Sequence, residues 1–557
     1  MQRARQSLLA TNTTSCLPGT LSTCVPVNFF GPPGSITPAQ AAFLNVQSTT
    51  DVRTTLGQAH GQISGDVGVA SPFASDPISF AVGAEYRRYT AVQNADLVAQ
   101  DPGDLGGSGA AILPFKGGYS VYEGFGELIA PLVQDKPFFK SLSFEGGIRQ
   151  SHYQVMAPSK PTYSTTTWKA GASWEPIDGV KFRGNFSHAV RAPNIGELFA
   201  PLNTSLTNLG NDPCAGSAPL NNANLRAVCL AQGAPAFTIG NIQNPAAGQP
   251  NATTGGNLNV KPERADGYTF GAVLSPRLLS GFSATVDYYH IKVNGAITTP
   301  TPGDVIFACF GSNTTSPPAG AATSPACTSI RRDPGTGGLD GDIATTPGLF
   351  AVLSNLGTLQ TSGIDVSFNY RRNLGFAKLS LNFQGNYTLE SKFQATPTSV
   401  NRDCVGYYSV NCSFTGSIQP KFQWNQRTTL SFGKIDLSLL WRHIDAVDFE
   451  PAALADQIQT ALGDPAGCPS PTGADPGACV FDPQFRHIKA ADYFDLAARF
   501  AVGEHFTFTL TVDNLLNRQP PIVGNDIGST AFNSGNTYPS TYDALGRRYG
   551  ASVKLKF

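Results

Sequence analysis

Apolar and polar residues alternate one by one along much of this chain. The clearest example lies in residues 375–391, where Leu379, Leu381 and Phe383 are separated by polar residues, and the same alternation runs through 546–557. Only an extended strand sends successive side chains to opposite faces, so a period of two predicts strands with one apolar and one hydrated face. A half-buried strand of a soluble protein shows the same pattern. The lengths of the connections between strands must therefore decide whether the protein is soluble or lies in a membrane.

Fifteen segments have this strand character. In one of them the pattern slips after Tyr288, where the apolar positions move to Tyr289, Ile291 and Val293. A bulge, or the exit of the strand from the membrane, is expected there. The predicted strands are 54–66, 78–90, 116–130, 140–155, 162–175, 180–190, 261–275, 281–294, 355–371, 375–391, 419–432, 434–447, 487–501, 505–514 and 546–557.

The connections alternate between short and long, which is typical of an outer-membrane barrel with periplasmic turns and extracellular loops. In a soluble β-sandwich, long loops are not expected at one end of the strands only. A propeller needs a fixed repeat, and the spacing of these strands varies too widely for one. The pattern therefore predicts an all-β, antiparallel transmembrane β-barrel. The short connections are 67–77, 131–139, 176–179, 276–280, 372–374, 433 and 502–504. The long connections are 91–115, 195–260, 295–354, 392–418, 448–486 and 515–545, with a short exception at 156–161.

Composition and charge agree with this class. The 557 residues include 58 glycines and 41 prolines, which interrupt helices, and no run of about 18 apolar residues predicts a membrane-spanning helix. A net charge of -1 gives no electrostatic case for binding nucleic acid. Trp424, Trp441, Tyr288 and Phe557 are interpreted as aromatics at the membrane interface rather than as a platform for stacking bases.

The ten cysteines form five pairs of sequence neighbours, each within a segment assigned to the loop side. Local pairs outside the strands predict disulfides made in an oxidising compartment, each restricting its loop by about 2 to 3 kcal/mol. Zinc is a weak alternative, because the spacing is wrong and no histidines cluster nearby. The predicted pairs are Cys16–Cys24, Cys214–Cys229, Cys309–Cys327, Cys404–Cys412 and Cys468–Cys479.

No residue pattern indicates an enzyme or a bound cofactor. His188, His290, His443 and His505 lie on separate predicted strands, and we interpret them as lumen or interface histidines. Calcium at Asp340-Gly341-Asp342 is a weak hypothesis, because no glutamate follows at the position that an EF-hand loop requires. A charged inward row lines either a hydrated lumen, which we favour, or a substrate path. That row contains Lys378, Glu390, Lys421, Arg427, Asp436, Arg442, Asp495 and Arg499.

Residues 186–199 read Phe-Ser-His-Ala-Val-Arg-Ala-Pro-Asn-Ile-Gly-Glu-Leu-Phe, which resembles the strand-to-loop motif of TonB-dependent outer-membrane receptors. Three further stretches, 257–264, 512–517 and 542–549, resemble that family in the same order. On residues alone, Pro193 and Pro262 need only mark strand ends beside loops. The positions that carry the resemblance are Arg191, Ala192, Pro193, Asn194, Glu197, Leu198, Phe199, Pro262, Glu263, Asn514, Gly546, Arg547 and the terminal Phe557.

The resemblance implies a barrel of about 22 strands in the bacterial outer membrane, filled by an amino-terminal plug. It also implies import of a scarce, bulky extracellular solute such as a ferric siderophore, cobalamin or an oligosaccharide. The expected partners are outer-membrane lipid, the barrel-assembly machinery acting on the carboxy-terminal strand, and TonB through the plug region only.

The chain departs from that pattern at its start, where Leu8, Leu9 and Ala10 are too short for the apolar part of a signal peptide. Neither a TonB box nor a plug is recognisable, and fifteen strands match the last part of such a barrel. We therefore expect an extracellular loop segment over 1–50 and an incomplete barrel over 51–557, with no TonB-dependent uptake by this chain alone. The alternatives are a passive porin-like channel and a non-transporting barrel remnant with surface-binding loops.

Overall fold

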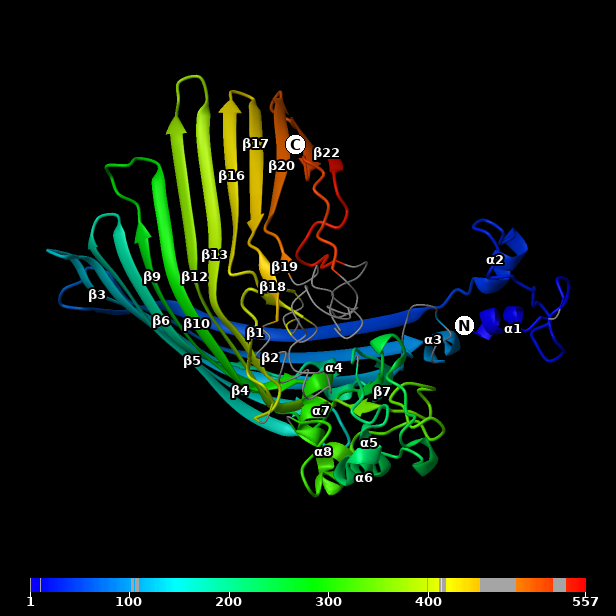
Figure 1. The fold of residues 1–557 in the computed structure, drawn as a ribbon. Coiled ribbons are helices and arrows are strands. Elements are labelled where there is room, and N and C mark those ends of the chain that lie inside the picture. The colour runs from blue at the N-terminus through cyan, green and yellow to red at the C-terminus, as the bar shows by residue number, and fades with distance from the viewer. Residues whose placement is uncertain are drawn as a thin grey trace, which may run out of the picture.

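One large, curved antiparallel sheet dominates the computed structural model (Figure 1). The structure describes residues 2–10, 12–101, 105, 110–209, 211–311, 313–397, 399–409, 412, 417–450, 487–523 and 537–556. The strands on the path of this sheet are β1 (Thr50–Ala70), β2 (Pro77–Ala95), β3 (Phe115–Lys136), β4 (Phe139–Val155), β5 (Thr162–Ile177), β6 (Val180–Arg191), β9 (Glu263–Leu274), β10 (Phe282–Thr298), β12 (Ser354–Asn373), β13 (Lys378–Gln394), β16 (Phe422–Phe432), β17 (Ile435–Ile444), β20 (Ala491–Val502), β21 (Phe506–Asp513) and β22 (Arg548–Leu555).

Each predicted strand overlaps one strand of this path, and neighbours along the path are neighbours in the order of the chain. This confirms the all-β antiparallel prediction. The short strand β14 (Arg402–Asp403) adds to the sheet by pairing with β13. Within the described residues, β1 pairs with β2 alone and β22 with β21 alone, so the sheet is open at these two edges.

The continuous register separates the sheet into two chemically different faces. Phe144, Ala172 and Gly184 lie opposite one another on β4, β5 and β6, on the apolar face that suits lipid. The other face carries cross-strand ion pairs, such as Arg183 on β6 with Asp287 on β10 at 2.6 Å. The alternation in the sequence therefore corresponds to an outer lipid face and an inner polar face.

The bulge expected after Tyr288 is wrong in position, whereas the alternative, exit of the strand from the membrane there, stays a prediction. β10 pairs with β9 and β12 without a register shift through Tyr288 and Tyr289, and the shift comes later, between Asn294 and Ala296. Tyr289 consequently shares the inner face with Asp287. Its hydroxyl accepts a hydrogen bond from Asn386 at 3.1 Å, so the aromatic residue is accommodated on the polar side.

The connections at one end of the strands are short turns, whereas the connections that follow β2, β6, β10, β13 and β17 at the other end contain helices or strands of their own (Figure 1). Segments 192–262 and 299–353 share one hydrophobic core, which includes Leu225, Ile306 and Leu339. Their elements are α4 (Ile195–Phe199), β7 (Asn203–Leu206), α5 (Ala218–Asn221), α6 (Ala223–Ala231), η1 (Ala236–Thr238), η2 (Ala246–Gly248), β8 (Asn251–Thr254), α7 (Pro302–Phe310), η3 (Ala321–Thr323), α8 (Pro325–Thr328) and β11 (Leu349–Phe350).

Besides the small sheet that β7, β8 and β11 form, a second small sheet lies among the later loops, and a few short helices precede β1 or follow β2. None of the helices in the described part of the chain is long and apolar enough to cross a membrane. The sheet contains β15 (Tyr407–Tyr408), β18 (Val447–Phe449) and β19 (His487–Ile488). The helices are α1 (Gln2–Leu8), α2 (Pro38–Leu44) and α3 (Leu97–Gln100).

Four of the five predicted disulfides are formed, all on the loop side of the strands. Two of them lie in the core shared by segments 192–262 and 299–353. The fifth predicted pair, Cys468–Cys479, lies outside the described residues. The disulfides are Cys16–Cys24, Cys214–Cys229, Cys309–Cys327 and Cys404–Cys412.

Candidate solute-binding site

The ends of β6 and β9 are joined by a network of ion pairs around Arg191. Its Nε donates to Glu263 Oε2 at 2.6 Å and its Nη2 to Glu263 Oε1 at 2.8 Å. The same guanidinium donates to Glu197 at 2.9 and 3.0 Å. Glu263 also accepts the backbone N–H of Ile297 at 2.6 Å. Three of the motif positions predicted from the sequence thus converge at one point on the inner face.

The helix α4 follows directly and turns the chain inward. Asn194 is its N-cap and forms a capping box with Glu197, which satisfies backbone N–H groups that the helix leaves free. Leu198 is buried, and Phe199 packs against Gly117 of β3. A Cβ at Gly117 would overlap the ring of Phe199, so only glycine permits this approach. Apolar docking and capping together fix the geometry of Glu197.

A cavity of about 600 Å³ opens above this network, between the inner face of the sheet and the loops. We call it the vestibule. Its described lining combines hydroxyl groups with apolar side chains. The lining residues are Arg191, Ser205, Leu206, Thr207, Asn208, Ala252, Thr254, Glu263, Ile297, Thr298, Thr299, Pro300, Thr301, Pro302, Leu349, Ala351, Leu353, Leu359 and Phe393.

Buried ion pairs hold the loops that form the walls of the vestibule. Arg332 and Asp212 are fully buried and joined by hydrogen bonds of 2.5 and 2.7 Å. Asp304 on α7 lies 3.3 Å from buried Arg402 and accepts the hydroxyl of Thr301 at 2.7 Å. Thr301 itself lines the vestibule, so this contact chain links β14 to the wall. The sequence does not predict these pairs, because their partners lie 120 and 98 residues apart.

The remaining described motif positions lie at the ends of strands or at a second junction, after β21. Pro262 directly precedes β9, and Ala192 and Pro193 connect β6 to α4, as expected for residues at strand ends. Asn514 lies at a second junction after β21, where its N–H donates to Asp495 at 2.8 Å. The N–H of Arg547 donates to Asn517 at 3.0 Å and Gly546 has a positive φ of 74°, whereas Phe557 lies outside the described residues.

The inner wall carries a further aromatic and ionic surface. The rings of Tyr89, Tyr119, Tyr153 and Tyr163, from four neighbouring strands, follow one another at centroid distances of 5.0, 6.3 and 5.0 Å. Tyr119 and Tyr163 pack against the same apolar cluster as Leu198. Only the strand register brings these residues together, which is why the linear sequence did not reveal them.

Several members of the predicted inward row form ion pairs with each other. Arg442 donates to Asp495 at 2.8 Å, and Arg499 donates to Asp436 at 2.7 Å. Pairing across strands stabilises charge on a hydrated wall. These contacts account for four of the row's charges without assigning them a ligand.

Two of the four histidines that we interpreted as lumen or interface residues pack with aromatic residues on the outer face. His188 stacks on Trp168 and lies 2.7 Å from Asp266, whereas His443 stacks on Trp424. Trp424 also contacts Trp441, with ring centroids 4.7 Å apart. Aromatic clusters on the outer face fit a membrane interface.

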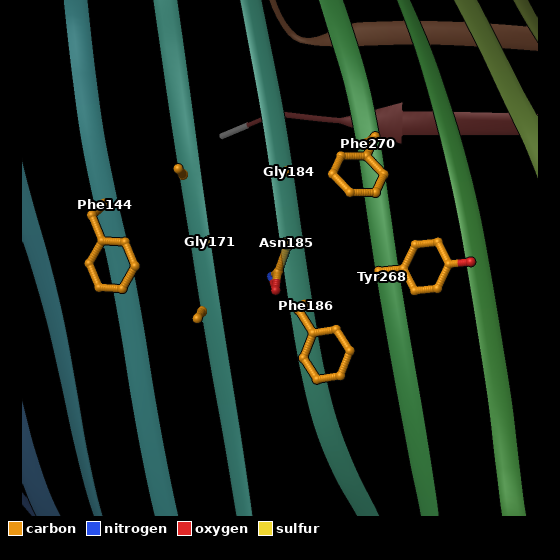
Figure 2. A pocket seen from close by; sticks show the side chains of 9 residues that line it. Phe144, Gly171, Gly184, Asn185, Phe186, Tyr268 and Phe270 are labelled. Carbon is orange, nitrogen blue, oxygen red and sulfur yellow. The ribbon is translucent and has the colours of Figure 1, made fainter.

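The outer face also has a hollow of about 610 Å³, shown in Figure 2. Phe144, Phe186 and Phe270 surround its small-residue floor, which includes Gly184. The lining is apolar and lies on the lipid face of the sheet. Its apolar lining contrasts with that of the vestibule, which also offers hydroxyl groups.

The aspartates considered for calcium serve loop geometry instead. Asp340 accepts the N–H of Ala246 at 2.9 Å, and Asp342 accepts that of Ala344 at 2.9 Å. In the described ranges, no group of three or more His, Cys, Asp or Glu side chains could hold a metal ion. Nearby, burial opposes charge on Asp333, but hydrogen bonds from Thr336, Gly335 and Thr346 outweigh it and lower the pKa of this carboxyl.

Comparison with known proteins assigns the fold to a family. Residues 13–515 match the family described as TonB dependent receptor-like, beta-barrel. None of the curated proteins matches the sequence.

Among solved structures, the ferric enterobactin receptor PfeA of Pseudomonas aeruginosa is similar, with a TM-score of 0.52 and 14% identity over 91% of this chain and 55% of that one. The siderophore receptor PirA of Acinetobacter baumannii is similar with a TM-score of 0.50 and 14% identity, over the same shares of the two chains. At this identity the likeness shows the fold alone, and the chain spans about 55% of their length. The matched residues and the barrel wall lead to one conclusion: the chain belongs to the TonB-dependent receptors of the bacterial outer membrane.

Proposed function

We propose that the chain forms the solute-binding wall of a receptor that imports a scarce, bulky extracellular solute with energy supplied through TonB. The two solved neighbours are named as a ferric enterobactin receptor and a siderophore receptor, and they make ferric siderophores the first solutes to test. Cobalamin and oligosaccharides are the other candidates.

The observation that carries this proposal is the position of the vestibule. It lies on the inner face, where the strands meet the long loops, and the motif residues Arg191 and Glu263 line it. Long loops face the exterior in outer-membrane barrels, so the vestibule meets solutes arriving from outside. A mixed lining of apolar and hydroxyl groups is typical of sites that orient small molecules.

Equilibrium binding to the purified chain in detergent micelles tests the proposal. Isothermal titration calorimetry with ferric siderophores, cobalamin and oligosaccharides should find saturable binding of at least one solute. Thr299→Trp, which fills the vestibule, should abolish this binding. Thr315→Trp, at an exposed loop position, should leave it unchanged.

The controls distinguish this proposal from the alternatives. Absence of binding by every solute, or equal binding by the Thr299→Trp variant, would contradict the vestibule as the solute site. Stable ion conductance of the chain in planar bilayers, without solute binding, would favour a porin-like channel instead.

A further inference from the structure

We propose that the vestibule selects an uncharged solute over a polyanionic one. The inference rests on the proposed function, because it takes the vestibule as the solute site. It concerns the charge class of the solute, which neither the family nor the fold assigns.

The charged residues of the vestibule lining, Arg191 and Glu263, already form ion pairs with each other and with Glu197 beside the vestibule. An arginine side chain has five N–H donors, and four hydrogen bonds join Arg191 to Glu197 and Glu263. Each carboxylate also accepts a backbone N–H, from Asn194 and Ile297 respectively. One cation facing two carboxylates leaves an excess of negative charge. A polyanion would have to compete with both carboxylates for Arg191.

The remaining lining offers hydrogen bonds without charge. Among the described lining residues, Arg191 and Glu263 are the only charged ones. Hydroxyls of Thr207, Thr254 and Thr299 alternate with apolar surface from residues such as Phe393. Such groups suit a solute with hydroxyl or amide groups on an apolar frame.

The two loops that supply most of the vestibule lining, 192–262 and 299–353, do not supply a positive field either. Their acidic residues outnumber their basic ones, and the buried Arg332 is neutralised by Asp212. Long-range attraction of a polyanion needs an excess of cations. Over 192–262 and 299–353, the basic residues are Arg226, Lys261, Arg331 and Arg332, and the acidic residues are Glu197, Asp212, Asp304, Asp333, Asp340 and Asp342.

The test compares matched probes on the purified chain by calorimetry. One pair is an uncharged ferric trihydroxamate and a polyanionic ferric tris-catecholate, and the other is a neutral oligosaccharide and its sulfated form. At least one uncharged probe should bind about tenfold or more tightly than its charged counterpart, a difference of about 1.4 kcal/mol. Binding of the uncharged probe should also be insensitive to salt.

Glu197→Gln changes the charge while keeping the local fold, because glutamine also completes a capping box. This variant should bind the polyanionic member of the pair about tenfold more tightly than the parent does, a gain of roughly 1.4 kcal/mol. The affinity for the uncharged member should not rise with it, so the preference for the uncharged member should fall by about tenfold. The matched control is Glu127→Gln, since Glu127 lies on β3, outside the vestibule, in a half-exposed pair with Lys169.

The outcomes separate the two proposals. Equal or tighter binding of the polyanionic probes by the parent chain contradicts the charge preference and leaves the vestibule as a solute site. An equal gain in affinity for the polyanionic probe in Glu127→Gln and Glu197→Gln also contradicts the charge preference, because the gain would then come from the overall charge of the protein. Absence of binding by all four probes and by cobalamin contradicts the proposed function itself.

Discussion

Arg191 at the end of β6 and Glu263 at the start of β9 are directly opposed in register, and two hydrogen bonds of 2.6 and 2.8 Å join their side chains. The segment 192–262 leaves the sheet at one partner and returns at the other. The pair therefore closes the base of this loop, and Glu197 extends the network into the first helix of the loop. One guanidinium thus fixes both the strand junction and the floor of the vestibule.

Arg191→Lys should lower the free energy of unfolding by about 1 to 3 kcal/mol, because an ammonium group cannot replace the two-point contacts with both carboxylates. Thermal unfolding in detergent micelles, followed by gel mobility, measures this change. Arg277→Lys is the control, since Arg277 is 80% exposed in its pair with Asp178 and should cost less than about 1 kcal/mol. Equal losses in both variants would show that Arg191 is an ordinary surface residue.

Arg332→Met should loosen the loops strongly. The substitution leaves the fully buried Asp212 without its cation, which costs about 3 to 5 kcal/mol. Limited proteolysis should cut segments 192–262 and 299–353 much faster in this variant. The neighbouring, exposed Arg331→Met serves as control and should resemble the parent; unchanged proteolysis of Arg332→Met would refute the role of the buried pair.

The disulfides should be found by peptide mapping under non-reducing conditions. Cys214–Cys229 and Cys309–Cys327 close segments with separations of 15 and 18 residues, and each should stabilise the loops by about 3 kcal/mol. Reduction should therefore accelerate proteolysis of the loops while leaving the strands protected. Free thiols at these positions in protein from the outer membrane would contradict the prediction. Cys468–Cys479 stays a prediction from spacing.

The turn around Asp333 should lose order in acid. Its folded-state pKa is lowered, so the fold favours the ionised carboxylate. That contribution is fully present above the ordinary pKa of 3.8 and is lost as pH falls through the lowered value. Hydrogen exchange at Gly335 and Thr336 should accelerate over this range in the parent. Asp333→Asn should remove the pH dependence; an identical acid response in that variant would assign it to another group.

The sequence predicted the barrel wall well, because strand alternation is a local property. Residues 378–383 are sufficient to identify the two faces of β13. Disulfides between cysteines that are close in the sequence could be predicted for the same reason. The motif residues Arg191, Glu197 and Glu263 were identified by resemblance, but their mutual contacts were not.

The features that the sequence did not predict depend on contacts between residues that are far apart in the chain. Arg332 and Asp212 are 120 residues apart, and no periodic pattern pairs them. The vestibule likewise combines residues as distant as Thr207, Thr299 and Phe393. The sequence predicted the register shift of β10 too early, because Tyr289 has the apolar ring expected of a lipid-facing residue. In the structure Tyr289 lies on the inner face, where its hydroxyl accepts a hydrogen bond from Asn386.

The most direct test of the vestibule as an extracellular solute site is thiol labelling of intact cells that carry the receptor in their outer membrane. Thr299→Cys should react with a membrane-impermeant maleimide, and a solute that binds the purified chain should slow that reaction. Leu278→Cys, in the short connection between β9 and β10, should react only after permeabilisation. Labelling of Leu278→Cys but not Thr299→Cys in intact cells, or labelling of Thr299→Cys that a bound solute leaves unchanged, would contradict the account.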